Sequence, residues 1–96
     1  MLGELTVDDF TPLVGKTFAI EVGDAVIDAI LTSAAPCGKP MPGATRQPFS
    51  LKFLLGQHQL QQRMYDVRHE KLELSNLFLV PVSPGPDGNC MEAVFS

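Results

Sequence analysis

The sequence PFSLKFLLG at residues 48–56 is the stretch that decides the fold of this chain. Its large apolar side chains recur at every second position, with Ser50 and Lys52 between them. This alternation is typical of a half-buried β-strand whose inner face carries Phe49, Leu51, Phe53 and Leu55. Two further apolar runs, at residues 63–68 and 74–82, follow after polar turns. The three runs predict an antiparallel meander, in which each strand pairs with the next.

Two strands joined by a tight turn are expected before this stretch. Residues 16–22 alternate between apolar and polar side chains, and Gly23 with Asp24 forms the predicted turn. Residues 25–34 are rich in β-branched side chains, which favours a second strand. A helix over residues 24–31 is the competing interpretation, because Ala, Ile and Leu also suit a helix. The core that we expect from these strands contains Phe18, Ile20, Phe49, Leu51 and Phe53.

The N-terminal residues predict one short helix over residues 6–14. Thr6 and Asp9 have the spacing of a capping box, with Asp in place of the preferred Glu. Pro12 keeps the helix short, and Gly15 ends it. We expect this helix to cover one mouth or edge of the sheet through Phe10, Leu13 and Val14.

The remaining segments complete the predicted architecture. Residues 35–46 hold three prolines and two glycines, which predicts a long loop. The sequence LFLVPV at residues 77–82 predicts a strand that is buried on both faces or covered on its outer face by the helix. Residues 83–89 predict a turn segment, and residues 90–96 a last strand that pairs into the sheet. The expected fold is a single, mainly β domain over residues 1–96, with about six antiparallel strands in a small curled sheet or barrel and one short N-terminal helix.

Composition and charge narrow the possible functions. The chain has 96 residues, of which 45% are hydrophobic and 19% charged, so it is too apolar for a disordered protein. Its net charge is −4 and it has no basic run, which argues against nucleic-acid binding. No apolar run approaches the ~20 residues that span a bilayer, and the first residues lack the features of a signal peptide. We therefore expect a cytoplasmic protein that does not associate with a membrane.

The reactive side chains form no recognised catalytic pattern. Cys37 and Cys90 are the only cysteines, and we expect two free thiols because the core is large enough without a disulfide. His58 and His69 are the only histidines, and their spacing is not that of a metal site. Cys37 and His69 with Asp66 have the residue types of a nucleophile, a base and an orienting group, but their spacing gives this arrangement no support.

Other oxygen-bearing side chains are explained by turn formation. The chain lacks the full ligand pattern of a calcium-binding loop, although oxygens are available from Asp24, Asp28, Asp87 and Asn89. We predict no catalytic, cofactor-binding or metal-binding residues and no cofactor. The residues that we name as candidates for a binding surface are Cys37, Arg46, Tyr65 and His69.

Four segments of the chain resemble a family of small bacterial proteins of unknown function, DUF6916. They are LTVDDF with LVG at residues 5–10 and 13–15, PFSL at residues 48–51, YDVRH with FLVPV at residues 65–69 and 78–82, and EAVF at residues 92–95. The resemblance implies a compact β domain without a catalytic motif. It also implies an accessory or structural role, because such domains are often encoded near proteins that resemble phage tail collars.

Two classes of function follow from this reading of the sequence. The first is a non-catalytic accessory or interaction module that binds another protein, which the resemblance associates with a phage-tail-like or tail-collar system. The alternative is a small-ligand-binding or enzymatic β-barrel with a pocket near residues 35–46 and His69. The sequence favours the first class, because no set of reactive groups converges.

Overall fold

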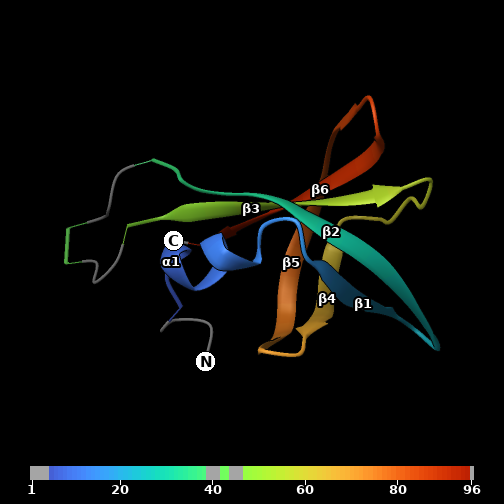
Figure 1. The fold of residues 1–96 in the computed structure, drawn as a ribbon, viewed down its shortest axis with the longest axis horizontal. Coiled ribbons are helices and arrows are strands. Elements are labelled where there is room, and N and C mark those ends of the chain that lie inside the picture. Colours follow the sequence, from blue (N-terminus) through green and yellow to red (C-terminus); the bar gives the residue numbers. More distant parts are fainter. Residues whose placement is uncertain (1–4, 39–41, 44–46, 96) are drawn as a thin grey trace.

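The strands of this protein close into a barrel in the computed structural model, which describes residues 5–38, 42–43 and 47–95 (Figure 1). The elements are α1 (Val7–Phe10), the 3-10 helix η2 (Thr11–Leu13), β1 (Thr17–Val22), β2 (Ala25–Pro36), β3 (Phe49–Gly56), β4 (Arg63–His69), β5 (Leu72–Gly85) and β6 (Gly88–Phe95). All strand pairs are antiparallel, and the order around the barrel is β1-β2-β3-β6-β5-β4. The predicted fold class, about six antiparallel strands with one short N-terminal helix, is confirmed.

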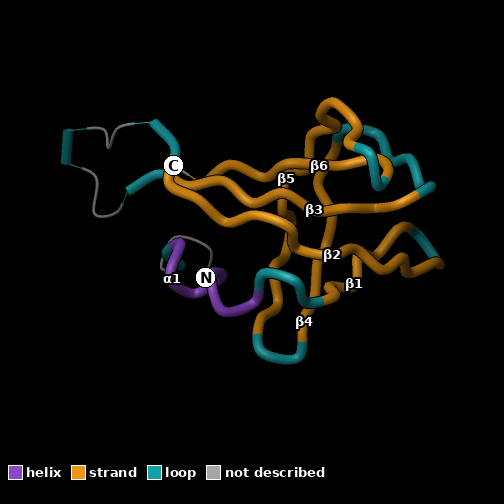
Figure 2. Tube along the Cα trace, turned by 45° about the horizontal axis from the view of Figure 1, so that its top comes forward, coloured by secondary structure: helices purple, strands orange, loops and turns teal. Residues whose placement is uncertain are grey.

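The predicted meander is wrong in one respect, because β3 and β4 are consecutive in sequence but are not paired. β3 pairs with β2 and β6, whereas β4 pairs with β1 and β5. In the closed order, β3 and β4 lie three strands apart in either direction. Residues 57–62 therefore carry the chain from one wall of the barrel to the opposite wall (Figure 2).

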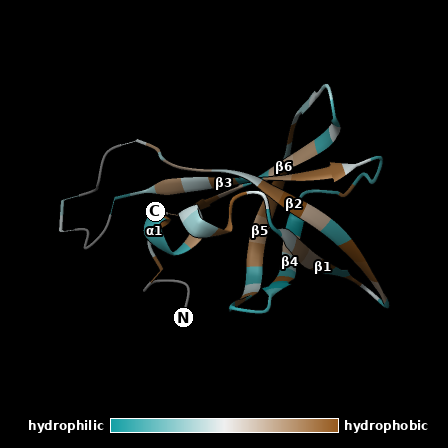
Figure 3. Ribbon diagram, in the orientation of Figure 1, coloured by the Kyte–Doolittle hydropathy of each residue, from teal (hydrophilic) through white to brown (hydrophobic). Residues whose placement is uncertain are grey.

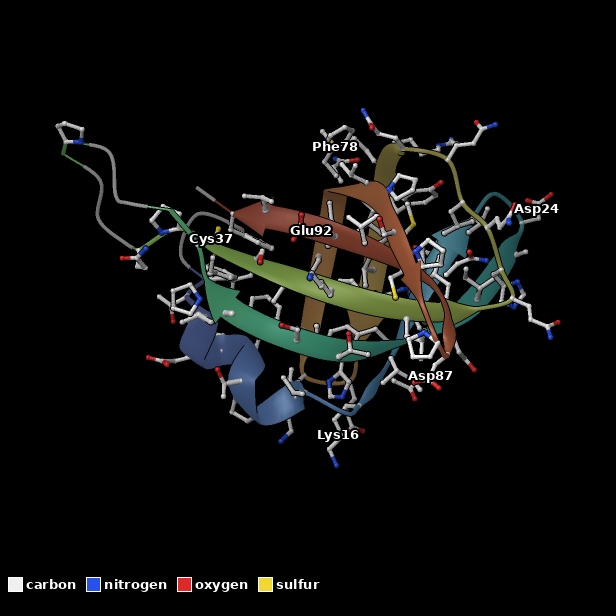
Figure 4. All side chains as sticks on the ribbon, turned by 90° about the horizontal axis from the view of Figure 1, so that it is seen from above. Lys16, Asp24, Cys37, Phe78, Asp87 and Glu92 are labelled. Atoms are coloured by element: carbon white, nitrogen blue, oxygen red, sulfur yellow. The ribbon has the colours of Figure 1, made fainter. Side chains whose placement is uncertain are left out.

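β2 and β5 are long strands that each belong to two parts of the barrel wall. β2 pairs with β1 along its first half and with β3 along its second half, and the register shifts between Leu31 and Ser33. β5 pairs first with β4 and then with β6. As a result, the layer of β2, β3 and β6 crosses the strands behind it at a large angle (Figure 4). The prediction of a strand over residues 25–34, in preference to a helix, is confirmed.

The strands extend further into the proline-rich segments than the sequence predicts. Ala35 and Pro36, expected in the loop over residues 35–46, belong to β2 and pair with β3. Most of residues 83–89, expected as a turn segment, also lie in strands, which are separated only by Pro86 and Asp87. Proline lacks an N–H donor, and a strand tolerates this near its end or beside an irregularity in the hydrogen-bond ladder.

The N-terminal segment is a helical turn followed by a 3-10 turn, and not the single helix predicted over residues 6–14. The capping box is present, since the Asp9 carboxylate accepts a hydrogen bond from the Thr6 N–H at 2.7 Å. Pro12 lies in the 3-10 turn, where its missing N–H removes no helical hydrogen bond. Phe10 and Leu13 are buried, but Val14 is extended and exposed, so the prediction that Val14 helps to cover the sheet is wrong.

The barrel interior contains the predicted core. The expected side chains are all fully buried, namely Phe18, Ile20, Phe49, Leu51 and Phe53. The C-terminal strand β6 pairs into the sheet as predicted, between β3 and β5. Its Phe95 ring stacks on Phe49 with 4.6 Å between the ring centroids. The Phe10 ring lies 5.7 Å from each of these two rings, so α1 closes this end of the barrel. Hydrophobic residues follow the strands, while the turn between β4 and β5 is hydrophilic (Figure 3). Among the described residues, no helix has the length and hydropathy to cross a membrane.

Replacement of Phe53 by alanine is expected to lower the free energy of unfolding by about 3–5 kcal/mol, the usual range for a buried phenylalanine. Phe53 is fully buried, and its ring packs edge-on against Phe18 with 5.4 Å between the centroids. Urea denaturation measures the change. Val26→Ala is the matched control, because the exposed Val26 side chain on the outside of β2 should contribute less than about 0.5 kcal/mol. A loss below about 1 kcal/mol for Phe53→Ala would contradict the assigned core.

Candidate functional site

His69 is the last residue of β4, and its side chain forms a hydrogen bond within the turn that follows. Its half-buried ring lies 5.0 Å from the Phe18 ring, and its Nδ1 accepts a hydrogen bond from the Lys71 N–H at 3.2 Å. A hollow of about 420 Å³ beside it is lined by residues of β1, β2 and β4 and by Glu70. The described part of the loop over residues 35–46 contributes nothing to this lining. Among the described residues, Cys37, Gly38, Pro42 and Gly43 are therefore not part of the hollow beside His69.

The Tyr65 side chain points into the barrel and forms a hydrogen bond with the segment before β4, residues 57–62. The side chain is buried, and its hydroxyl donates a hydrogen bond to the Gln61 carbonyl oxygen at 2.7 Å. The Arg63 guanidinium lies 5.6 Å from the centre of the same ring. These contacts give Tyr65 a structural part in holding residues 57–62 on the barrel, and they leave little of the ring available to a partner.

Cys37 directly follows the last residue of β2. Its N–H donates to the Pro48 carbonyl oxygen at 2.8 Å, and the Gln47 amide donates to the Gly38 carbonyl oxygen at 2.9 Å. These bonds join the two ends of the loop. Cys37 and Cys90 are both free cysteines. The contacts of the described residues do not bring together Cys37, Asp66 and His69, and Arg46 lies outside the described residues.

Charged side chains gather on the outside of β1, β4 and β5. Arg68 forms an ion pair with Glu21. Asp66 accepts a hydrogen bond from the Asn76 N–H at 3.0 Å, which supports an irregularity of the ladder where Asn76 has a φ of 56°. The side chains of Arg68 and Glu21 are 50% and 36% exposed, so solvent screens the attraction between them and this ion pair contributes little to stability. Within the described part of the chain, no three His, Cys, Asp or Glu side chains are placed to hold a metal ion.

The surface feature that the sequence reasoning missed is an apolar stripe on the outside of β4, β5 and β6. We call it the outer stripe, and it consists of Met64, Phe78, Val80 and Val94. Met64 is 56% exposed, Phe78 44% and Val94 62%, and Val80 is half-buried. A contiguous exposed apolar patch is a feature of many protein–protein interaction surfaces.

Strand register explains why the members of the outer stripe lie together. Met64 on β4 is directly opposite Phe78 on β5. Val80 on β5 is opposite Glu92 on β6. Phe78 comes two positions before Val80, and Val94 comes two positions after Glu92. Because the two strands are antiparallel, Phe78 and Val94 lie at the same end of the pair. Period-two alternation then keeps Phe78 and Val80 on the outer face, while Leu77 and Leu79 are buried. Figure 4 shows Phe78 and Glu92 on this side of the barrel.

The predicted burial of residues 77–82 on both faces is therefore wrong. Phe78 is exposed, and α1 packs elsewhere, at the end of the barrel formed by Phe49 and Phe95. The available signal was the sequence LFLVPV itself, because a strand with apolar residues on both faces needs a cover for each face. The barrel core covers the inner face of this strand, which carries Leu77 and Leu79. No described residue buries Phe78 on the outer face.

The comparisons with known proteins identify a family and assign no activity. No curated protein and no solved structure matches the chain. One family model, described as Domain of unknown function (DUF6916), matches residues 5–95. All the helices and strands of the described structure lie within the match, from α1 to β6. The chain therefore belongs to the DUF6916 family.

Proposed function

We propose that this protein is a non-catalytic interaction module that binds another protein through the outer stripe. The observation that carries the proposal is the exposure of Met64, Phe78 and Val94 on one side of the barrel. Burial of exposed apolar surface stabilises a complex by about 25 cal/mol per Å² of apolar area removed from water, before the costs of association. Phenylalanine and methionine are also enriched in the centres of protein interfaces.

The charges beside the outer stripe suit a protein partner. Glu92 is opposite both Val80 and Lys52, so an anionic and a cationic position adjoin the apolar side chains. A polar rim around an apolar centre is the usual anatomy of a specific interface. The free thiols Cys37 and Cys90 fit a reducing compartment, and we place the protein in the cytoplasm. A component of a phage-tail-like or tail-collar assembly is the first partner to test.

The proposal predicts that a double variant, Met64→Ser with Phe78→Ser, loses its partner. The protein is immobilised and exposed to an extract of its native cell, and retained proteins are identified by mass spectrometry. Loss of two central contacts, each worth about 2 kcal/mol in a typical hot spot, should reduce retention more than tenfold. Val26→Ser is the control, because Val26 on β2 is about as exposed as Met64 and lies outside the outer stripe.

The experiment distinguishes specific binding through the outer stripe from non-specific hydrophobic binding. Thermal melts of all three proteins first establish that each is folded. A partner retained by the wild type and by Val26→Ser, but not by the double variant, supports the proposal. If the wild type retains nothing, or retains the same proteins as the double variant, the proposed function is wrong. Sedimentation of the wild type alone shows whether the partner is a second copy of the chain.

A further inference from the structure

A cavity of about 250 Å³ lies at the end of the barrel where β3 leads into residues 57–62 and β5 turns into β6. Its apolar lining consists of Leu55, Leu60, Pro81, Val82 and Met91. Leu55 and Met91 are almost fully buried, so the floor of the cavity is the barrel core itself. Gln59, Asn89 and Cys90 add two amides and a thiol.

The walls of this cavity are fixed by hydrogen bonds. The Asn89 side-chain amide donates to the His58 carbonyl oxygen at 3.1 Å, which ties β6 to residues 57–62. The His58 N–H donates to the Leu55 carbonyl oxygen at 3.3 Å, and the Tyr65 hydroxyl holds Gln61. A site whose walls are already in place loses little conformational entropy when a ligand binds.

We propose that the cavity binds a small neutral molecule with an apolar body of one or two rings and one hydrogen-bonding group. The described lining residues carry no charged side chain, and a charged ligand would lose its hydration there without a partner. An engineered cavity of about 150 Å³ binds benzene, so the larger volume here accommodates a somewhat larger body. The Gln59 and Asn89 amides offer the polar contact. This site shares no lining residue with the outer stripe and goes beyond the proposed interaction function.

Cys90 provides a built-in reporter of occupancy, with Cys37 as its internal control. Cys90 lines the cavity, whereas Cys37 lies at the opposite end of the layer formed by β2, β3 and β6, far from the β5–β6 hairpin that carries Asp87 (Figure 4). Both thiols are free and half-buried. The probe is indole, a neutral two-ring molecule with one N–H donor. Iodoacetamide alkylation of each cysteine is followed by mass spectrometry at increasing indole concentrations.

Indole is expected to slow the alkylation of Cys90 in a saturable manner and to leave Cys37 unchanged. At ten times the dissociation constant the protection should be about tenfold, because only the unoccupied cavity admits the reagent. Equal rates with and without indole, up to the solubility limit, would overturn the proposal. Equal protection of both cysteines would also overturn it, because a shared effect would mean non-specific binding.

A variant that fills the cavity gives the second test. Val82→Phe places a larger side chain in the lining and should abolish the saturable amide shifts that indole causes in a ¹⁵N-¹H NMR titration of the wild type. Val26→Phe adds the same bulk to an exposed site on β2 and should bind indole normally. Indole binding by a folded Val82→Phe as tight as by the wild type would show that the ligand sits elsewhere. If Val82→Phe does not fold, the alkylation of the wild type decides the question.

Discussion

A chain that stops after Asn89 is expected to be unfolded or only marginally folded at room temperature. β6 lies between β3 and β5 in the closed barrel, so its loss leaves unpaired backbone groups on both neighbours. The deletion also removes the buried side chains of Met91, Ala93 and Phe95. Phe95 and Met91 each contribute about 1.5–3 kcal/mol by burial, against a total stability of about 5–15 kcal/mol for a domain.

Circular dichroism and a thermal melt test this expectation. A chain that stops after Phe95 is the matched control, because it lacks only Ser96 and keeps β6 as the structure describes it. The control should melt like the full-length protein, and the shorter chain should show no cooperative transition. If the shorter chain melts within about 5 °C of the full-length protein, the loss is only about 1 kcal/mol, and closure of the barrel by β6 is not required for folding.

Alternation in single strands made the core predictable. Phe49, Leu51 and Phe53 recur at period two, and a strand sends alternate side chains to opposite faces, so their burial follows from local sequence. Phe18 and Ile20 in β1 follow the same rule. The pairing of strands is different, because it depends on contacts between residues far apart in the sequence. Residues 57–62 have the polar composition of a hairpin loop, yet they connect opposite walls of the barrel.

The candidate site is harder to predict than the core, because sequence patterns point to residues with reactive side chains and not to exposed apolar ones. Tyr65 and His69 carry such groups, and each forms a hydrogen bond with the backbone of a neighbouring residue, Gln61 and Lys71 respectively. The outer stripe and the cavity consist mainly of apolar side chains, which local sequence cannot distinguish from core. Met64 and Phe78 become a surface only because β4 and β5 pair in the observed register. Both sites therefore depend on which strands pair and in which register, and not on the local sequence of any one strand.

Replacement of Gly88 by alanine is expected to destabilise the protein by about 2–6 kcal/mol, which combines backbone strain of about 1–3 kcal/mol with overpacking of a similar size. Gly88 begins β6 with a φ of +133°, a conformation that residues with a side chain rarely adopt. A Cβ at this position would clash with the carbonyl oxygen of Gly56, and it would also lie 2.7 Å from the Gly56 carbonyl carbon and Cα. These are backbone atoms, so no side-chain rotation relieves the contact.

Gly85→Ala is the matched control for this prediction, because Gly85 is in the same hairpin, has no positive φ, and has open space where its Cβ would be. Urea denaturation should show a change below about 0.5 kcal/mol for Gly85→Ala and the large loss only for Gly88→Ala. Because Gly56 is paired with Asn89, relief of the clash must separate the end of β3 from β6. That separation would also disturb the Asn89–His58 hydrogen bond at the cavity wall, so any folded Gly88→Ala protein should expose Cys90 to faster alkylation than the wild type. Equal stability of the two alanine variants would mean that the close approach of Gly88 to Gly56 does not exist in solution.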